Sequence, residues 1–248
     1  LNDQRKQMTE NGIRAASEEI DALPELPKVL VVYLKDCHES VAGIIAGRLK
    51  EKYYRPSFVL TDSQEAGFLK GSGRSIEGYH MFHALEEVAP LLSKFGGHPM
   101  AAGLTLPESE LGRFREQLNR NALLSEAQLI ETQWIVIALP FAYANEDLIA
   151  ELSRMEPFGQ GNVRPCFGQK HVEIRSARVL GKNRNVVKLS LRDEAGTVRE
   201  AIAFTDGDAF LAEMAESKYF AVLYFPELNE YLGRTSLQLV LKAWKFER

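Results

Sequence analysis

The stretch Gly71–Gly103 contains two clusters of small residues, GSGRS at positions 71–75 and GGHPMAAG at positions 96–103. Glycine adopts positive φ angles and lets other groups approach the backbone N–H groups, so such clusters indicate a backbone that lies against something. Within them, Arg74 offers a guanidinium and His98 a second polar side chain. A guanidinium beside hydroxyls and free amides suits a phosphate or a carboxylate, because it donates two charge-assisted hydrogen bonds at once.

The same clusters also have a purely structural interpretation. Gly71 and Gly73 would form a turn that leaves Arg74 in solvent, and Gly96 and Gly97 would only end the apolar segment before them. The chemistry of these residues by itself favours neither interpretation. A choice between them needs the rest of the chain.

The order of the motifs along the chain resembles one protein family. GSGRS, an amphipathic segment and FGGHPMAAG (95–103) are followed by EPFGQGN (156–162), Pro165 and Phe167. This order is similar to the DHH-associated domain, the connector and the OB domain of RecJ-type single-strand-specific exonucleases, in the DHH phosphoesterase superfamily. The family's catalytic half carries Asp-rich metal motifs and an Asp-His-His triplet, and no such triplet occurs in these 248 residues. We therefore expect the chain to be the C-terminal part of a larger enzyme.

The resemblance implies a phosphate site in the two clusters. Ser72 and Arg74 match the positions that bind the terminal 5′ phosphate in the family, and a turn at Gly96-Gly97-His98 would line the same cleft. The residues predicted to bind the DNA end are Ser72, Arg74, Ser75, Gly96, Gly97 and His98.

His38 is a further candidate, in the stretch Asp36-Cys37-His38-Glu39 between an expected strand and an expected helix. Ligands of open α/β sheets gather at such positions, and the family has a similar His-Glu pair there. The alternative is a histidine that caps the helix or packs against it. We predict no catalytic residue in this chain and treat His98 and His38 only as residues that line the cleft.

The composition is that of a soluble protein with ordinary cores: 45% of the residues are hydrophobic and 26% are charged. No apolar run approaches the roughly 20 residues of a membrane-spanning helix, and the polar N-terminus is unlike a signal peptide, so we expect a cytoplasmic protein without membrane contact. Cys37 and Cys166 are far apart and predict free thiols. We predict no metal site here, while the resemblance implies Mn²⁺ or Mg²⁺ in a catalytic domain outside these residues.

Hydrophobic periodicity predicts an α/β domain in the first part of the chain. By the resemblance, residues 1–27 would be the end of a connector helix, which Pro24 and Pro27 stop, and residues 28–154 would be the DHH-associated domain. The apolar run KVLVVYL (28–34) predicts a strand buried on both faces of a mixed sheet. Helices would flank this sheet at 38–54, 79–92, 108–124 and 145–155, with further strands at 56–60, 68–75, 101–106 and 134–139.

Residues 155–248 would form the connector and a small all-β barrel of the OB type. Short strands are expected at 172–180, 186–192, 198–204, 220–225 and 236–244, with a helix at 208–216. No acidic residue occurs between Ile174 and Arg192. We predict that cations of this hairpin hold the phosphates of a single DNA strand whose bases stack on aromatics, the alternative being a solvated strand face. These cations are Arg175, Arg178, Lys182, Arg184, Lys188 and Arg192.

The resemblance therefore implies the substrate-binding part of a RecJ-like 5′-to-3′ exonuclease that acts on single-stranded DNA in repair and recombination. Single-stranded DNA would be its ligand, and a single-strand-binding protein or a helicase would be the candidate protein partner. One alternative is a phosphodiesterase of the same superfamily for short oligonucleotides or cyclic dinucleotides, against which the barrel-like tail argues. Another is a non-catalytic single-strand-binding adaptor, against which the connector-like helix argues.

Overall fold

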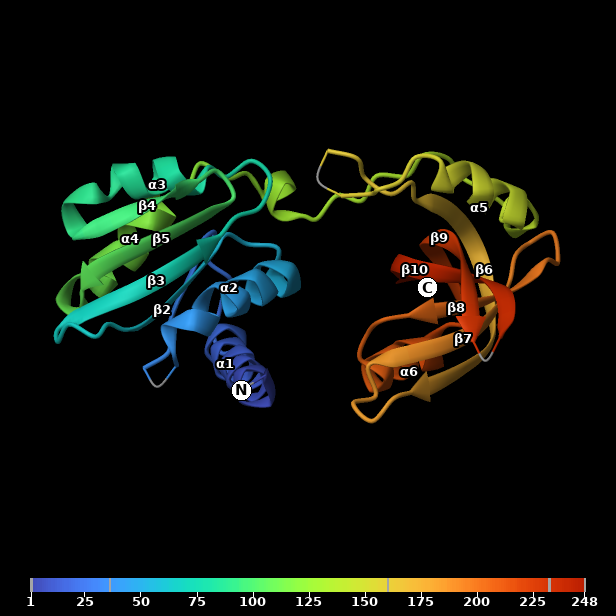
Figure 1. Ribbon diagram of the computed structural model, residues 1–248, viewed down its shortest axis with the longest axis horizontal. Coiled ribbons are helices and arrows are strands. Elements are labelled where there is room, and N and C mark those ends of the chain that lie inside the picture. The colour runs from blue at the N-terminus through green and yellow to red at the C-terminus, as the bar shows by residue number, and fades with distance from the viewer. Residues whose placement is uncertain (1, 36, 160, 232, 248) are drawn as a thin grey trace. The chain divides into compact units, whose positions relative to one another are not determined.

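The structure is a computed structural model that describes residues 2–35, 37–159, 161–231 and 233–247. The chain divides into two compact units, Leu1–Glu131 and Thr132–Arg248 (Figure 1). The boundary that we expected after residue 154 therefore lies within the second unit. No helix among the described residues is long and apolar enough to cross a membrane.

The first unit contains a five-stranded mixed sheet with the strand order β1-β2-β3-β5-β4. Only β1 and β2 are parallel, and the other neighbours are antiparallel. The strands are β1 (Leu30–Tyr33), β2 (Ser57–Asp62), β3 (Phe68–Arg74), β4 (Lys94–His98) and β5 (Ala101–Pro107).

β4 corrects the sequence prediction, which placed a turn at Gly96, Gly97 and His98. These residues form the end of a strand that pairs with β5, and the chain reverses at Pro99 and Met100. The backbone of these residues pairs with β5, and two adjacent glycines in a sequence do not reveal such a partner. The glycine pair therefore wrongly suggested a turn.

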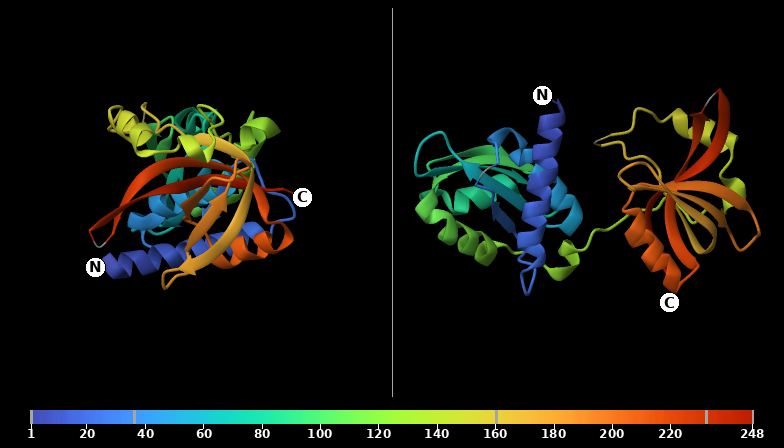
Figure 2. Two further views of the ribbon diagram at one scale, coloured as in Figure 1. Left: turned by 90° about the vertical axis from the view of Figure 1, so that its right-hand side faces the viewer. Right: turned by 90° about the horizontal axis from the view of Figure 1, so that it is seen from below.

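Helices cover both faces of the sheet (Figures 1 and 2). Leu30, Val32 and Val59 pack with α1 and α2, whereas Val31 and Phe58 pack on the other side with α3 and α4. The apolar run at 28–34 thus forms a strand buried on both faces, as predicted. The helical segments are α1 (Asn2–Asp21), α2 (Glu39–Tyr53), α3 (Met81–Glu87), η1 (Ala89–Leu91), η2 (Glu108–Glu110), α4 (Leu111–Asn121) and η3 (Glu126–Leu129).

The second unit is a closed barrel with the strand order β10-β8-β7-β6-β9. β10 pairs parallel with β8 and antiparallel with β9, and a helix separates β8 from β9, which matches the predicted OB type. The elements are β6 (Phe167–Leu180), β7 (Val186–Arg192), β8 (Val198–Ala203), α6 (Gly207–Glu216), β9 (Tyr219–Tyr231) and β10 (Arg234–Phe246).

The segment before the barrel carries η4 (Phe141–Tyr143) and α5 (Glu146–Ser153) and belongs to the same core. Phe141 is fully buried, its N–H donates to the Asp193 carboxylate over 3.0 Å, and the Tyr224 hydroxyl donates to the carbonyl of Leu139 over 2.7 Å. The predicted strand at 134–139 does not form. Within it, only Ala138 makes an isolated bridge, to Gly168, so the segment lies along the start of β6 without a complete ladder.

Candidate nucleic-acid interface

The GSGRS cluster forms most of β3, so its side chains alternate between the two faces of the sheet. A β-carbon on Gly73 would lie 2.6 Å from the Phe58 ring and 2.9 Å from the Met81 sulfur, so the core beneath α3 has room only for glycine. The interpretation as a turn is therefore wrong. The other face, on the side of α2, carries Lys70, Ser72 and Arg74.

The strand register aligns three rows of residues across β3, β5 and β4. α2 packs against β2 and β3, and Lys94, Gly96 and His98 of β4 and Gly103 of β5 are exposed on this side. We call this surface the open face. Its rows are Arg74–Ala101–His98, Ser72–Gly103–Gly96 and Lys70–Thr105–Lys94.

The middle row of the open face has almost no side chains. Packing does not require glycine at positions 96 and 103 of this row. A β-carbon on Gly96 would meet nothing within 4 Å, and one on Gly103 would meet only the carbonyl oxygen of Gly71, at 3.8 Å. Neither glycine has a positive φ angle. The bare row therefore leaves the sheet backbone open to close approach by a ligand.

Gly97 differs from its neighbour Gly96, because the fold requires a glycine at this position. Its φ angle is +156°, and a β-carbon would lie 2.4 Å from the carbonyl oxygen of Ala101. Gly97 thus shapes the end of β4 and presents no group of its own to the open face. Of the two glycines predicted to bind phosphate, only Gly96 lies in a row of this face.

Arg74 is a half-buried cation without a carboxylate partner within 4 Å among the described residues. Its Nη1 donates to the carbonyl of Gly73 over 2.8 Å, and a β-carbon on Gly43 of α2 would lie 2.8 Å from its Nη2. Gly43 therefore makes room for the guanidinium. Lys70, four residues earlier, is instead paired with Glu39 at 2.8 Å. An unpaired guanidinium beside a bare backbone suits an anion.

Two of the predicted site residues have structural tasks. Ser75 is 1% exposed and its hydroxyl donates to the carbonyl of Tyr79, so it does not contribute to the open face. The Nδ1 of His38 accepts a hydrogen bond from the Ser40 N–H over 3.2 Å and caps α2, as the alternative interpretation stated. His98 is exposed and lies in the same row as Arg74.

Sequence reasoning missed Lys94, Thr105 and Gly103 on the open face. The apolar residues of β5 show which of its side chains face the core. The register between β5 and β4 could not be predicted, because β4 itself was not predicted. Once Phe95 is assigned to the core, Lys94 must lie on the other face.

The cations of the barrel hairpin are more strongly paired than the sequence suggests. Arg184 bonds Asp208 through two nitrogens, one at 2.8 Å, and this contact lowers the pKa of the Asp208 carboxyl. Lys188 lies 3.2 Å from Glu200, and Arg192 lies 2.6 Å from Glu173. Of the six hairpin cations, the other three, Arg175, Arg178 and Lys182, have no carboxylate within 4 Å among the described residues.

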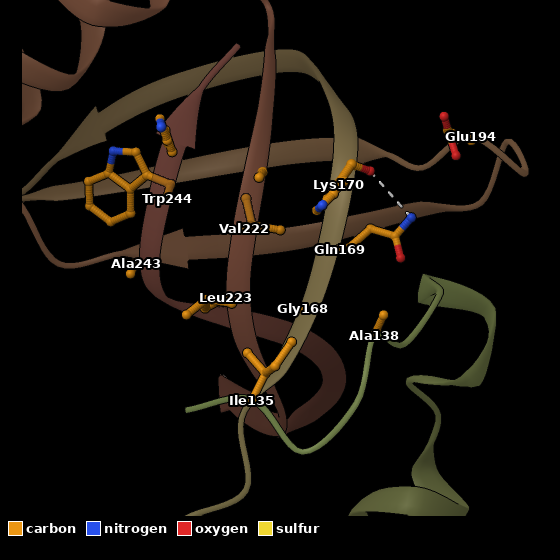
Figure 3. Close-up of a pocket in the computed structure, with 12 residues that line it drawn as sticks. Ile135, Ala138, Gly168, Gln169, Lys170, Glu194, Val222, Leu223, Ala243 and Trp244 are labelled. Carbon is orange, nitrogen blue, oxygen red and sulfur yellow. Dashed lines mark hydrogen bonds between the residues drawn. The ribbon is translucent and has the colours of Figure 1, made fainter. Parts of the chain in front are cut away.

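An apolar pocket of about 460 Å³ lies beside β6, β9 and β10 (Figure 3). Ile135, Leu223 and Trp244 form part of its wall, and Lys170 also lines it. Its mainly apolar wall does not suit a phosphate. Among the described residues, no group of three His, Cys, Asp or Glu side chains could hold a metal ion, so these residues do not fit a metal centre.

Two family models match the two units. Residues 26–122 match the DHHA1 domain, and residues 136–243 match the RecJ OB domain. The unmatched residues between these ranges include the division at Glu131 and Thr132.

Curated relatives cover almost the whole chain. Over 98% of this chain, the sequence is 30% identical to the single-stranded-DNA-specific exonuclease RecJ of Bacillus subtilis. Over 88% of this chain, it is 34% identical to the RecJ of Haemophilus influenzae. The fold of RecJ from Thermus thermophilus, in a crystal structure with Mg²⁺, covers 100% of the chain with a TM-score of 0.77 and 24% identity.

The chain spans 31% and 38% of the two curated relatives and 36% of the crystallised chain. Its first unit is a DHHA1 domain and its second a RecJ OB domain. The chain therefore belongs to the RecJ family and matches the C-terminal part of its members.

Proposed function

We propose that this chain binds the 5′-phosphorylated end of single-stranded DNA and is the substrate-binding part of a RecJ-like 5′-to-3′ exonuclease. The observation that carries the proposal is Arg74, an unpaired guanidinium beside the bare row Ser72–Gly103–Gly96. A terminal phosphate carries more negative charge than an internal one, so a fork of N–H donors favours the end of a strand. The curated relatives are named single-stranded-DNA-specific exonucleases, which supports single-stranded DNA as the ligand.

Each group on the open face has a task in this proposal. Arg74 pairs with the terminal phosphate, the Ser72 hydroxyl donates to the same group, and His98 lies in the row of Arg74 on the exposed edge of the sheet. Gly96 and Gly103 let the sugar-phosphate backbone approach the strands. The barrel adds affinity that does not depend on the strand's end, through its unpaired cations.

Hydrolysis would be the task of residues outside these 248, where Mg²⁺ or Mn²⁺ would activate the attacking water. We accordingly expect the chain alone to leave labelled single strands intact in the presence of Mn²⁺. Cleavage that copurifies with the chain and is absent from a mock preparation would contradict this division of labour. A role of the whole enzyme in DNA repair and recombination in the cytoplasm, with a single-strand-binding protein or a helicase as partner, belongs to the same proposal.

The proposal is tested by the binding of oligonucleotides with a 5′ phosphate or a 5′ hydroxyl, each labelled at the 3′ end. Arg74→Ala should abolish the preference for the phosphorylated end, and Arg74→Lys should restore little of it, because lysine lacks the fork of donors. Arg48→Ala is the matched control, since Arg48 is an exposed arginine of α2 paired with Glu51. Equal loss on both oligonucleotides would assign Arg74 a structural role and refute the proposed site.

A further inference from the structure

The barrel carries an exposed phenylalanine that internal packing does not explain. Phe204 follows β8 directly, and 68% of its surface is exposed, whereas Ala201 and Ala203 before it are buried. The alternation of the strand thus points Phe204 away from the core. Single exposed apolar side chains are common on protein surfaces, so the neighbours of Phe204 decide whether it belongs to a binding surface.

The register places Phe204 in an apolar row on the outer face of the barrel. The N–H of Thr205 donates to the carbonyl of Asn185 over 3.1 Å, which continues the β7–β8 ladder beyond the pair Val187–Ala203. Phe204 therefore lies opposite Val186, which in turn lies opposite Leu180 of β6. Because Val187 is buried, these three residues face outward together.

A basic row lies next to this apolar row. Lys188 is directly opposite Arg178 on one side and Ile202 on the other. Two residues of a strand span about 7 Å, so the two rows are neighbours on the surface. Like charges directly opposite each other destabilise a sheet, and only Lys188 has a carboxylate partner, Glu200. A bound polyanion would remove this cost.

We propose that Phe204 stacks on a base of single-stranded DNA while Arg178, the cation of the basic row without a carboxylate partner, holds a neighbouring phosphate. The apolar row receives the base and the basic row receives the backbone, which is the division of surface that sequence-tolerant binding of single strands requires. OB barrels bind oligonucleotides on the face of their second and third strands, here β7 and β8 (Figure 1). This inference rests on the proposed binding of single-stranded DNA and adds to it the residue that contacts the bases.

The test compares an oligothymidylate with an abasic strand of equal length, both long enough to fill the roughly 4–16-nucleotide site of an OB fold. Phe204→Ala should weaken binding of the oligothymidylate by about 5- to 150-fold, which corresponds to the 1–3 kcal/mol of one stacked base. Binding of the abasic strand should not change, because that strand offers phosphates alone. The slope of affinity against salt should also stay constant, because stacking releases no counterions.

Two further variants test whether the effect of Phe204→Ala comes from lost base stacking. Phe204→Trp should keep the affinity, and its additional fluorescence should be quenched by the oligothymidylate. Tyr143→Ala is the matched control, because Tyr143 is 64% exposed in the same unit but lies outside the two rows. Unchanged affinity of Phe204→Ala, or an equal loss on the abasic strand, would overturn the inference and leave the Arg74 site intact. Failure of the unaltered chain to bind either strand would overturn the proposed role of the barrel as well.

Discussion

The open face of the first unit and the outer face of the barrel both present cations, but they are built in opposite ways. The open face depends on missing side chains, because Gly96 and Gly103 leave its middle row bare beside the unpaired Arg74. The barrel face depends on many side chains, and carboxylates pair three of its six predicted cations, namely Arg184, Lys188 and Arg192.

The difference separates two kinds of recognition. A bare backbone with one forked cation can fix the position of a single group, since any shift of the ligand breaks directed hydrogen bonds. A surface of partly paired cations and one exposed aromatic holds a strand without fixing its register. We infer that the first face selects an end and the second face holds whatever strand is attached to it.

The largest expected effect distinguishes glycines that serve the fold from glycines that serve the ligand. Gly97→Ala should destabilise the first unit by about 3 kcal/mol, because its positive φ angle and the carbonyl of Ala101 leave no room for a β-carbon. Gly96→Ala, one residue earlier, is the control and should unfold at the temperature of the unaltered chain. Circular dichroism during heating measures both, and equal transitions would show that β4 tolerates side chains at either position.

Filling the bare row should separate stability from binding. Gly103→Val places a branched side chain where the structure has open space, and valine favours strands, so the unfolding temperature should not fall. Affinity for 5′-phosphorylated single strands should drop at least tenfold, about 1.4 kcal/mol. Anisotropy titration gives the affinity. Unchanged affinity would mean that the DNA end does not lie on this row.

The two serines of GSGRS should respond in opposite ways. Ser75→Ala removes a buried hydrogen bond to the carbonyl of Tyr79 and should cost about 1 kcal/mol of stability, with the preference for a 5′ phosphate unchanged. Ser72→Ala should reduce that preference at constant stability. If Ser75→Ala instead lost the preference for a 5′ phosphate, Ser75 would belong to the phosphate-binding site.

The smallest effect concerns the salt dependence of binding to the barrel. Arg178→Ala should lower the slope of log affinity against log salt by about 0.7, the value for one phosphate of a single strand. Arg184→Ala should change the slope less, because Asp208 already holds its guanidinium. Equal changes would show that the ion pair opens when DNA binds, which would remove the distinction between paired and unpaired cations.

Sequence reasoning selected several residues of the open face without predicting the register of its strands. Ser72, Arg74 and His98 could be selected from residue types and a family resemblance, and the structure aligns Arg74 and His98 in one row. It failed at Ser75, whose hydroxyl partner is a backbone carbonyl in a following loop. It failed also at β4, where two glycines suggested a turn.

For the barrel, the sequence prediction failed because it counted charges within one contiguous segment of the chain. The segment between Ile174 and Arg192 has no acidic residue, but Glu173, Glu200 and Asp208 reach it from its flank, the next strand and the helix. Charge counted along a chain says little about charge across a sheet. Phe204 was inside a predicted strand, and only the observed burial of its neighbours shows which way it points.

The place of β10 in the barrel has a consequence for how the protein is made. β10 pairs with both β8 and β9, so the barrel cannot close before residues 234–246 are synthesised. Until then β8 and β9 present unpaired edges, which invite pairing with other chains. A ribosome that stalls within β10, or a protease that cuts there, would leave an open sheet prone to aggregation, so quality control of this unit depends on its final strand.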